Sequence, residues 1–188
     1  MRRQVANLVS LLRLVLTLPF LDAVGRAAHG ASGWPAAGYF AAIALSDFVD
    51  GRIARRFGAA SRGGRVLDHG ADIVFLLSAL GLYAALGLAP WWVPAAVAAS
   101  FGVYVVDSAR RSGGRPTLIG SRLGHLGGVG NYVVVGVLVG NETVGLHWLP
   151  PVVLSALFAL VPLYSGASIL SRLAAGGAAR TPAAPPRG

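Results

Sequence analysis

Long apolar stretches are the feature that most restricts what this 188-residue chain can fold into. A helix needs about 20 mostly apolar residues to cross a bilayer, and the sequence supplies such stretches repeatedly. They predict transmembrane helices at residues 5–24, 34–57, 65–88, 91–109, 119–140 and 148–172. With 55% hydrophobic and 12% charged residues, the chain carries more apolar surface than one soluble core can bury. We therefore expect an all-α, polytopic membrane protein with six transmembrane helices.

The sequence predicts one membrane domain followed by a tail. Residues 1–173 contain all the predicted helices, whereas residues 174–188 are rich in alanine, glycine, proline and arginine. Such a segment has too few large apolar residues to fold, so we expect a disordered cytoplasmic tail. No internal repeat is apparent, which gives an inverted-repeat transporter little support. The chain has no cysteine, so neither disulfides nor thiolate metal sites are possible.

The basic residues are all arginine and gather at one end of the predicted helices. The termini and the loops near 58–64 and 110–118 carry nearly all of them, whereas the opposite loops carry only Arg26. By the positive-inside rule, both termini are expected to be cytoplasmic, in the cell (inner) membrane. The tryptophans mark the opposite helix ends, as interfacial rings do; they are Trp34, Trp91, Trp92 and Trp148. The net charge of +9 is therefore a topology signal, and we expect no nucleic-acid partner.

Four of the seven acidic residues lie within or at the edge of two neighbouring predicted helices: Asp47, Asp50, Asp68 and Asp72. A carboxylate in the hydrocarbon region costs about 2.5–3.5 kcal/mol, so four together need compensating charge. Spacings of three and four residues put each pair on one helix face, and the short intervening stretch favours an antiparallel hairpin. Oxygen ligands of this kind suit Mg²⁺, Mn²⁺ or Ca²⁺ and not zinc. The alternative is that the aspartates only pair with nearby arginines.

Other residues of this hairpin suit a phosphate-bearing substrate. Gly51 and Ala54 keep one helix face shallow, and Arg55 can bind a phosphate through two hydrogen bonds. Gly64 opens the second helix, where a missing side chain permits close approach of a ring or phosphate.

The order of these residues resembles a family signature. Asp47-x-x-Asp50-Gly51-x-x-Ala54-Arg55, eight residues, then Gly64-x-x-x-Asp68-x-x-x-Asp72 is similar at every fixed position to that of the CDP-alcohol phosphatidyltransferases. Asn7, Arg13 and Pro19 also look like the first helix of this family. The resemblance implies a homodimer of six-helix subunits, each with a cytoplasm-facing polar cavity that binds a CDP-linked lipid.

The resemblance also implies roles for the hairpin residues. The aspartates would hold two Mg²⁺ or Mn²⁺ ions, and Asp72 would also act as general base. The CDP-lipid would be bound by Gly51, Ala54, Arg55 and Gly64. The reaction expected is transfer of a phosphatidyl group from CDP-diacylglycerol to an alcohol with release of CMP, a step of phospholipid biosynthesis.

The acceptor alcohol is less well defined. Glycerol-phosphate and cardiolipin-type members usually carry proline and lysine where this chain has His69 and Ile73. Glycerol 3-phosphate, inositol phosphate, inositol, serine and phosphatidylglycerol all remain open. We expect a phosphorylated acceptor, glycerol 3-phosphate first, because cationic residues flank the second cytoplasmic loop. The candidate acceptor-binding residues are Arg110, Arg115, Arg122 and His125.

Several of these residues have simpler interpretations. The loop arginines serve as positive-inside anchors in any case. Arg13 is expected to extend to the headgroups, and Asp107 to pair with a local arginine. The glycines of the fifth predicted helix are expected to allow close helix packing; they are Gly124, Gly127, Gly128 and Gly130.

Two other classes of protein place carboxylates in a membrane. An aspartate-rich intramembrane prenyltransferase also binds pyrophosphate through magnesium, but its two motifs usually lie far apart in sequence. A divalent-cation transporter would use the carboxylates as its transport site. Arg55 would repel the transported ion, which disfavours that alternative.

Overall fold

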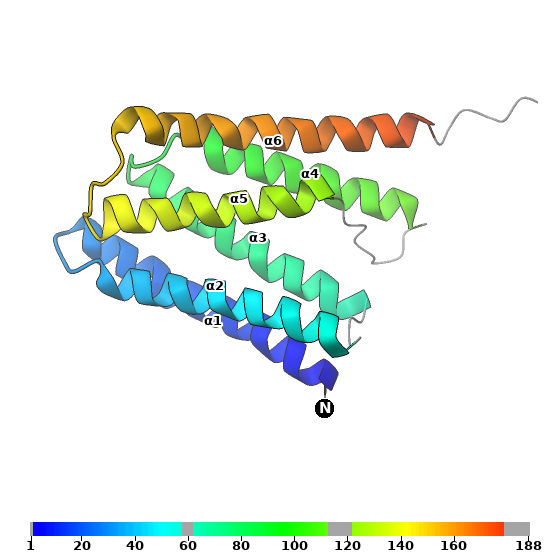
Figure 1. Ribbon diagram of the computed structural model, residues 1–188, viewed down its shortest axis with the longest axis horizontal. Coiled ribbons are helices and arrows are strands. Elements are labelled where there is room, and N and C mark those ends of the chain that lie inside the picture. The colour runs from blue at the N-terminus through cyan, green and yellow to red at the C-terminus, as the bar shows by residue number, and fades with distance from the viewer. Residues whose placement is uncertain (1, 58–61, 113–121, 179–188) are drawn as a thin grey trace, which may run out of the picture.

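The computed structural model describes residues 2–57, 62–112 and 122–178, with side chains described over residues 10–46, 66–112 and 126–174. This part of the chain forms six α-helices (Figure 1). They are α1 (Arg2–Ala28), α2 (Trp34–Phe57), α3 (Arg62–Ala85), α4 (Trp92–Arg111), α5 (Arg122–Leu138) and α6 (Pro151–Ala178). A π-helical turn, η1 (Val139–Thr143), continues α5. The all-α prediction is confirmed, and each predicted helix has its counterpart.

The ends of the helices differ from the predicted ends by a few residues. Helix α1 extends beyond the predicted range 5–24 at both ends. The flanking residues are helical but add little hydropathy, so the apolar stretch alone did not include them. In the same way α6 runs on to Ala178, past the expected end at 172. The remainder of the expected tail, residues 179–188, lies outside the described residues.

Successive helices run in alternating directions, so the N-terminus and the end of α6 lie at the same end of the bundle (Figure 1). Within the described residues, three helices are long and apolar enough to cross a bilayer: Val66–Ala85, Trp92–Arg111 and Pro151–Ala174. Large apolar side chains such as Leu18, Leu163 and Leu170 are exposed on the outside of the bundle, as expected of a surface that faces lipid.

Two groups of helices make up the bundle. In one, α1 packs against α2 and α3; in the other, α6 packs against α4 and α5. Contacts from α3 to α4 and α5 join the groups. Phe75 of α3 lies at the junction, since its ring centroid is 5.4 Å from that of Phe20 and 5.6 Å from that of Tyr132. These aromatic contacts bring α1, α3 and α5 together.

Small residues allow the helices to approach closely. A Cβ atom on Gly127 or Gly130 would lie 3.3 or 3.5 Å from the ring of Tyr164 on α6. The packing role expected for these two glycines is therefore confirmed. Gly128 has no neighbour within 4 Å of such an atom, and Gly124 lies outside the described side chains.

The end of the bundle opposite the termini is held by one tight contact. A Cβ atom on Gly33, in the turn before α2, would lie 1.9 Å from the carbonyl oxygen of Thr143 at the end of η1. The Thr143 hydroxyl is 2.6 Å from the hydroxyl of Tyr83 on α3. The turn between α1 and α2 thus meets both η1 and α3 at one point, where only glycine fits.

Gly33→Ala is expected to destabilise the protein by about 1–3 kcal/mol, since the added methyl meets backbone that cannot rotate away. The melting temperature of the detergent-solubilised variant should fall. Gly102→Ala is the matched control, because a Cβ there meets nothing within 4 Å and alanine favours the helix. If both variants melt at the wild-type temperature, the contact between Gly33 and Thr143 is not as tight as described.

Candidate active site

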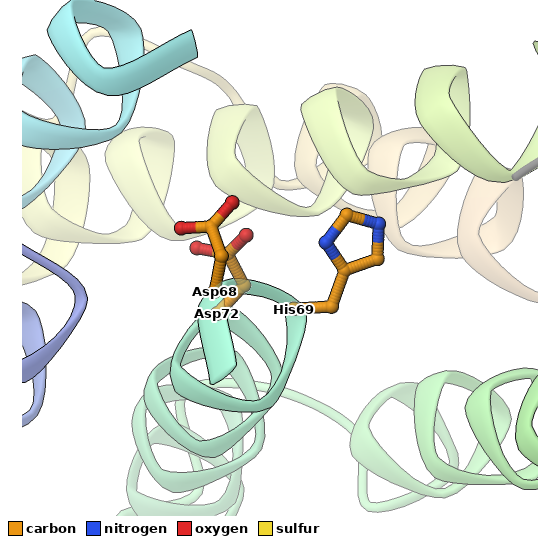
Figure 2. Close-up of side chains that lie close together, drawn as sticks. All are labelled: Asp68, His69 and Asp72. Atoms are coloured by element: carbon orange, nitrogen blue, oxygen red, sulfur yellow. The ribbon is translucent and has the colours of Figure 1, made fainter. Parts of the chain in front are cut away.

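Two of the predicted metal ligands lie side by side on α3. Asp68 and Asp72 are one helical turn apart, and their side chains are 34% and 24% exposed. With His69 they form a group whose potential ligand atoms all lie within 4.8 Å of one another. Figure 2 shows the two carboxylates close together, with the imidazole beside them on the same helix. The expected shared face for Asp68 and Asp72 is therefore present.

Arg13 on α1 supplies a positive charge to this pair. Its side chain is fully buried, and Nη1 donates hydrogen bonds to Oδ1 of Asp68 at 3.2 Å and to Oδ1 of Asp72. The expectation that Arg13 extends to the headgroups is wrong. The guanidinium pairs with the carboxylates because opposite charges that lie together inside the bundle compensate each other.

Two hydroxyl groups also bond to the carboxylates. Ser10, one turn before Arg13, donates to Oδ1 of Asp68 at 3.3 Å. Tyr132 on α5 donates to Oδ1 of Asp72 at 2.9 Å. Hydrogen bonds to charged acceptors are among the stronger ones, so Tyr132 holds the Asp72 carboxylate in one orientation.

His69 adds a nitrogen to the group. Its Nδ1 is buried and has no hydrogen-bond partner among the described residues, and in Figure 2 a ring nitrogen faces the carboxylates. The ring centroid lies 6.2 Å from that of Tyr104 on α4. An imidazole nitrogen in this position can ligate a metal.

The remaining predicted hairpin residues lie outside the described side chains. The backbone places Asp47, Asp50, Gly51, Ala54 and Arg55 on the C-terminal half of α2 and Gly64 near the start of α3. Both segments belong to the end of the bundle that holds the N-terminus (Figure 1). Their position is compatible with the hairpin, but their side-chain contacts stay predictions.

The predicted acceptor residues are only partly described. Arg110 is exposed on the last turn of α4. Arg115 lies outside the described residues, and Arg122 and His125 lie on the first turn of α5, outside the described side chains. Their grouping around an acceptor therefore stays a prediction.

Asp107 belongs to a separate network between α4 and α6. It accepts a hydrogen bond from Arg111 at 2.8 Å and one from Arg172 at 3.2 Å. The Arg172 guanidinium also lies 4.4 Å from the ring centroid of Tyr104. The expectation that Asp107 pairs with a local arginine is confirmed, and the grouping of Asp68, His69 and Asp72 does not include it.

The fold and this polar cluster define a helical membrane protein with an acidic site set among apolar helices. The sequence model of one family, CDP-alcohol phosphatidyltransferase, matches residues 3–170. The chain belongs to the CDP-alcohol phosphatidyltransferase family, whose members are phosphotransferase enzymes.

Individual relatives match over a shorter stretch. A Mycobacterium tuberculosis protein provisionally named phosphatidylglycerophosphate synthase is 40% identical over 90 residues, which cover 47% of this chain and 43% of the relative. A Mycobacterium bovis protein provisionally named cardiolipin synthase is 35% identical over 88 residues, covering 47% of this chain and 41% of the relative. The match thus spans less than half the length of these relatives.

The sequence did not predict the contacts of Arg13, Ser10 and Tyr132. For Arg13 a signal was present, because an arginine deep in an apolar helix needs a counter-ion as much as an aspartate does. Nothing in the sequence singles out Ser10 or Tyr132, since a hydroxyl group is common in helices of this kind.

Tyr132→Phe and Asp72→Asn are expected to be coupled in a double-mutant cycle. The hydrogen bond between the two side chains should appear as an interaction free energy of unfolding of about 1 kcal/mol or more. Tyr164→Phe is the matched control, because its hydroxyl donates to Asn131 and not to the carboxylates. Its effect should add to that of Asp72→Asn, and equal additivity for Tyr132→Phe would contradict the hydrogen bond.

Proposed function

We propose that this protein is a CDP-alcohol phosphatidyltransferase of phospholipid biosynthesis, which moves a phosphatidyl group from CDP-diacylglycerol to an alcohol and releases CMP. The observation that carries the proposal is the carboxylate pair of Asp68 and Asp72 on α3, which occupies the last two aspartate positions of the signature. Family membership supports the reaction class.

The residues of the cluster fit divalent cations. Both carboxylates turn toward one shared positive group, the Arg13 guanidinium, so the pair favours positive charge between its oxygens. Carboxylate oxygens are suitable ligands for Mg²⁺ and Mn²⁺, and His69 offers a nitrogen that Mn²⁺ tolerates better than Mg²⁺ does. We propose that Asp47, Asp50, Asp68 and Asp72 hold two such ions. Bound there, the ions would supply the charge that neutralises the pyrophosphate and its leaving group.

The protein's own residues would perform the remaining steps. Gly51, Ala54, Arg55 and Gly64 are proposed to bind the cytidine and the pyrophosphate of the CDP-lipid. The acceptor oxygen then forms a bond to the phosphorus that carries the lipid, while the bond from that phosphorus to the CMP oxygen breaks. CMP leaves with the electron pair, and Asp72 takes the proton of the acceptor hydroxyl. Tyr132 keeps the Asp72 carboxylate oriented for this transfer.

Glycerol 3-phosphate is the acceptor that we propose. The name of the Mycobacterium tuberculosis relative, phosphatidylglycerophosphate synthase, supports it. Arg110, Arg115, Arg122 and His125 would bind the acceptor phosphate. The name of the second relative keeps phosphatidylglycerol as the competing acceptor. The match to the family speaks against both the prenyltransferase and the cation transporter.

The proposed setting is the cell (inner) membrane. Six crossings with both termini on the cytoplasmic side agree with the alternating helix directions and with the distribution of arginine. The polar cluster would then open toward the cytoplasm, where CDP-linked lipid headgroups and soluble acceptors meet. A homodimer is proposed from the family resemblance.

Asp68→Asn is expected to abolish nearly all CMP release from CDP-diacylglycerol, with partial recovery at high Mn²⁺, because a metal ligand is lost. Asp72→Asn should lower turnover by about 10²–10⁴-fold while the CDP-lipid still binds, since a general base acts on the acceptor.

The control for both variants is Asp22→Asn, the same change at an exposed aspartate on α1 that pairs with Arg26. Its CMP release should equal that of the wild type. Full activity of Asp68→Asn at ordinary Mg²⁺ would refute the metal role, and loss of lipid binding in Asp72→Asn would refute its role as base.

Arg115→Ala and Arg122→Ala, made separately, are expected to raise the KM for glycerol 3-phosphate and leave that for CDP-diacylglycerol unchanged, because each loses a contact to the acceptor phosphate. Steady-state CMP release at varied acceptor concentration measures both constants. Arg26→Ala, at an exposed arginine on α1, is the control. Unchanged acceptor kinetics in both variants, or preferred turnover of serine or inositol, would overturn the choice of acceptor.

A further inference from the structure

Arg13 is a charged residue of the site to which the proposed reaction assigns no role. It is fully buried, it comes from a helix outside the signature hairpin, and one nitrogen, Nη1, bonds to both Asp68 and Asp72. We propose that Arg13 is a resident counter-ion of the carboxylate pair, which keeps the site assembled without metal and which divalent ions must displace from the shared oxygens. This inference rests on the proposed metal-dependent function.

The charges of the group support this role. A guanidinium stays protonated in any protein environment, so Arg13 supplies a permanent positive charge. Without it, two carboxylates within 4.8 Å of each other would repel in a medium of low dielectric constant. The arginine therefore stabilises the empty site and joins α1 to α3.

The same contacts oppose metal binding. Nη1 bonds to Oδ1 of each aspartate, and these are oxygens that a divalent ion would ligate. A divalent ion placed between the carboxylates would meet the buried positive charge of Arg13. The free energy with which Arg13 binds the carboxylates is therefore subtracted from the binding free energy of the metal. Removing the charge should therefore tighten metal binding, even though it removes a native contact.

The helix restricts how far Arg13 can retreat. The Thr17 hydroxyl donates to the Arg13 carbonyl oxygen at 2.8 Å, within a continuous helix. The side chain has no exposed surface through which to leave. Displacement by a metal is therefore a local shift of the guanidinium, and its charge continues to act on the site.

The test compares Mn²⁺ binding and melting temperature for full-length, detergent-solubilised wild type, Arg13→Met and Arg13→Lys. Free Mn²⁺ can be followed by its electron paramagnetic resonance signal. Arg13→Met should melt lower than the wild type without metal, should bind Mn²⁺ on the order of tenfold more tightly, and should regain most of the lost stability at saturating Mn²⁺. Arg13→Lys, which keeps the charge, should show a smaller gain in affinity.

Arg172→Met is the matched control. Arg172 is also a buried arginine bonded to an aspartate, but its partner, Asp107, lies outside the cluster. This variant should lose the same stability with and without Mn²⁺, and its Mn²⁺ affinity should equal that of the wild type.

The outcomes separate the two proposals. Unchanged or weaker Mn²⁺ binding in Arg13→Met would overturn the inference, because Arg13 would then position the ligands and not compete for them. If Arg13→Met fails to fold, Mn²⁺ affinity in Arg13→Lys at or below the wild-type value has the same meaning. A wild type that binds no Mn²⁺ and releases CMP in the presence of chelator would instead refute the proposed metal-dependent function.

Discussion

The ion pair between Arg13 and the two aspartates of α3 is the interaction on which the rest of the site depends. Each of these charges is costly next to hydrocarbon, and each becomes acceptable only beside the other. Because Arg13 belongs to α1 and the carboxylates to α3, compensation requires these helices to pack together. Tyr132 extends the same dependence to α5. The chemistry of the site and the packing of three helices therefore share one set of contacts.

A second charge network performs a similar task in the other half of the bundle. Asp107 links α4 to α6 through Arg172, and the Tyr104 ring lies between Arg172 and His69. Among the described side chains, the two networks thus approach each other through the Tyr104 ring. In the same half of the bundle, glycines of α5 that face Tyr164 let α5 and α6 approach closely. Among the described residues, the buried arginines Arg13 and Arg172 both make cross-helix contacts to aspartates, while large apolar side chains are exposed on the outside of the bundle.

The helices could be predicted from the sequence because the length and hydropathy of a stretch are local properties. The spacing of Asp68 and Asp72 is also local, which is why their shared face was predictable. The partners of Arg13 could not be predicted, because they lie 55 and 59 residues away and depend on which helices become neighbours. The contact between Tyr132 and Asp72 could not be predicted for the same reason, because 60 residues separate the two. The side chains of Asp47 and Asp50 lie outside the described residues, so their part of the site remains a prediction.

The separation of Arg13 and Asp68 along the chain has a consequence for biosynthesis. Ribosomes add about 5–20 residues per second. Arg13 is therefore made several seconds before Asp68, which follows 55 residues later. During that interval the charge of Arg13 has no acidic partner on α3. The contact that joins α1 to α3 can therefore form only after the third helix has been made. A ribosome stalled between the two would leave a nascent chain in which Arg13 lacks both of its carboxylate partners.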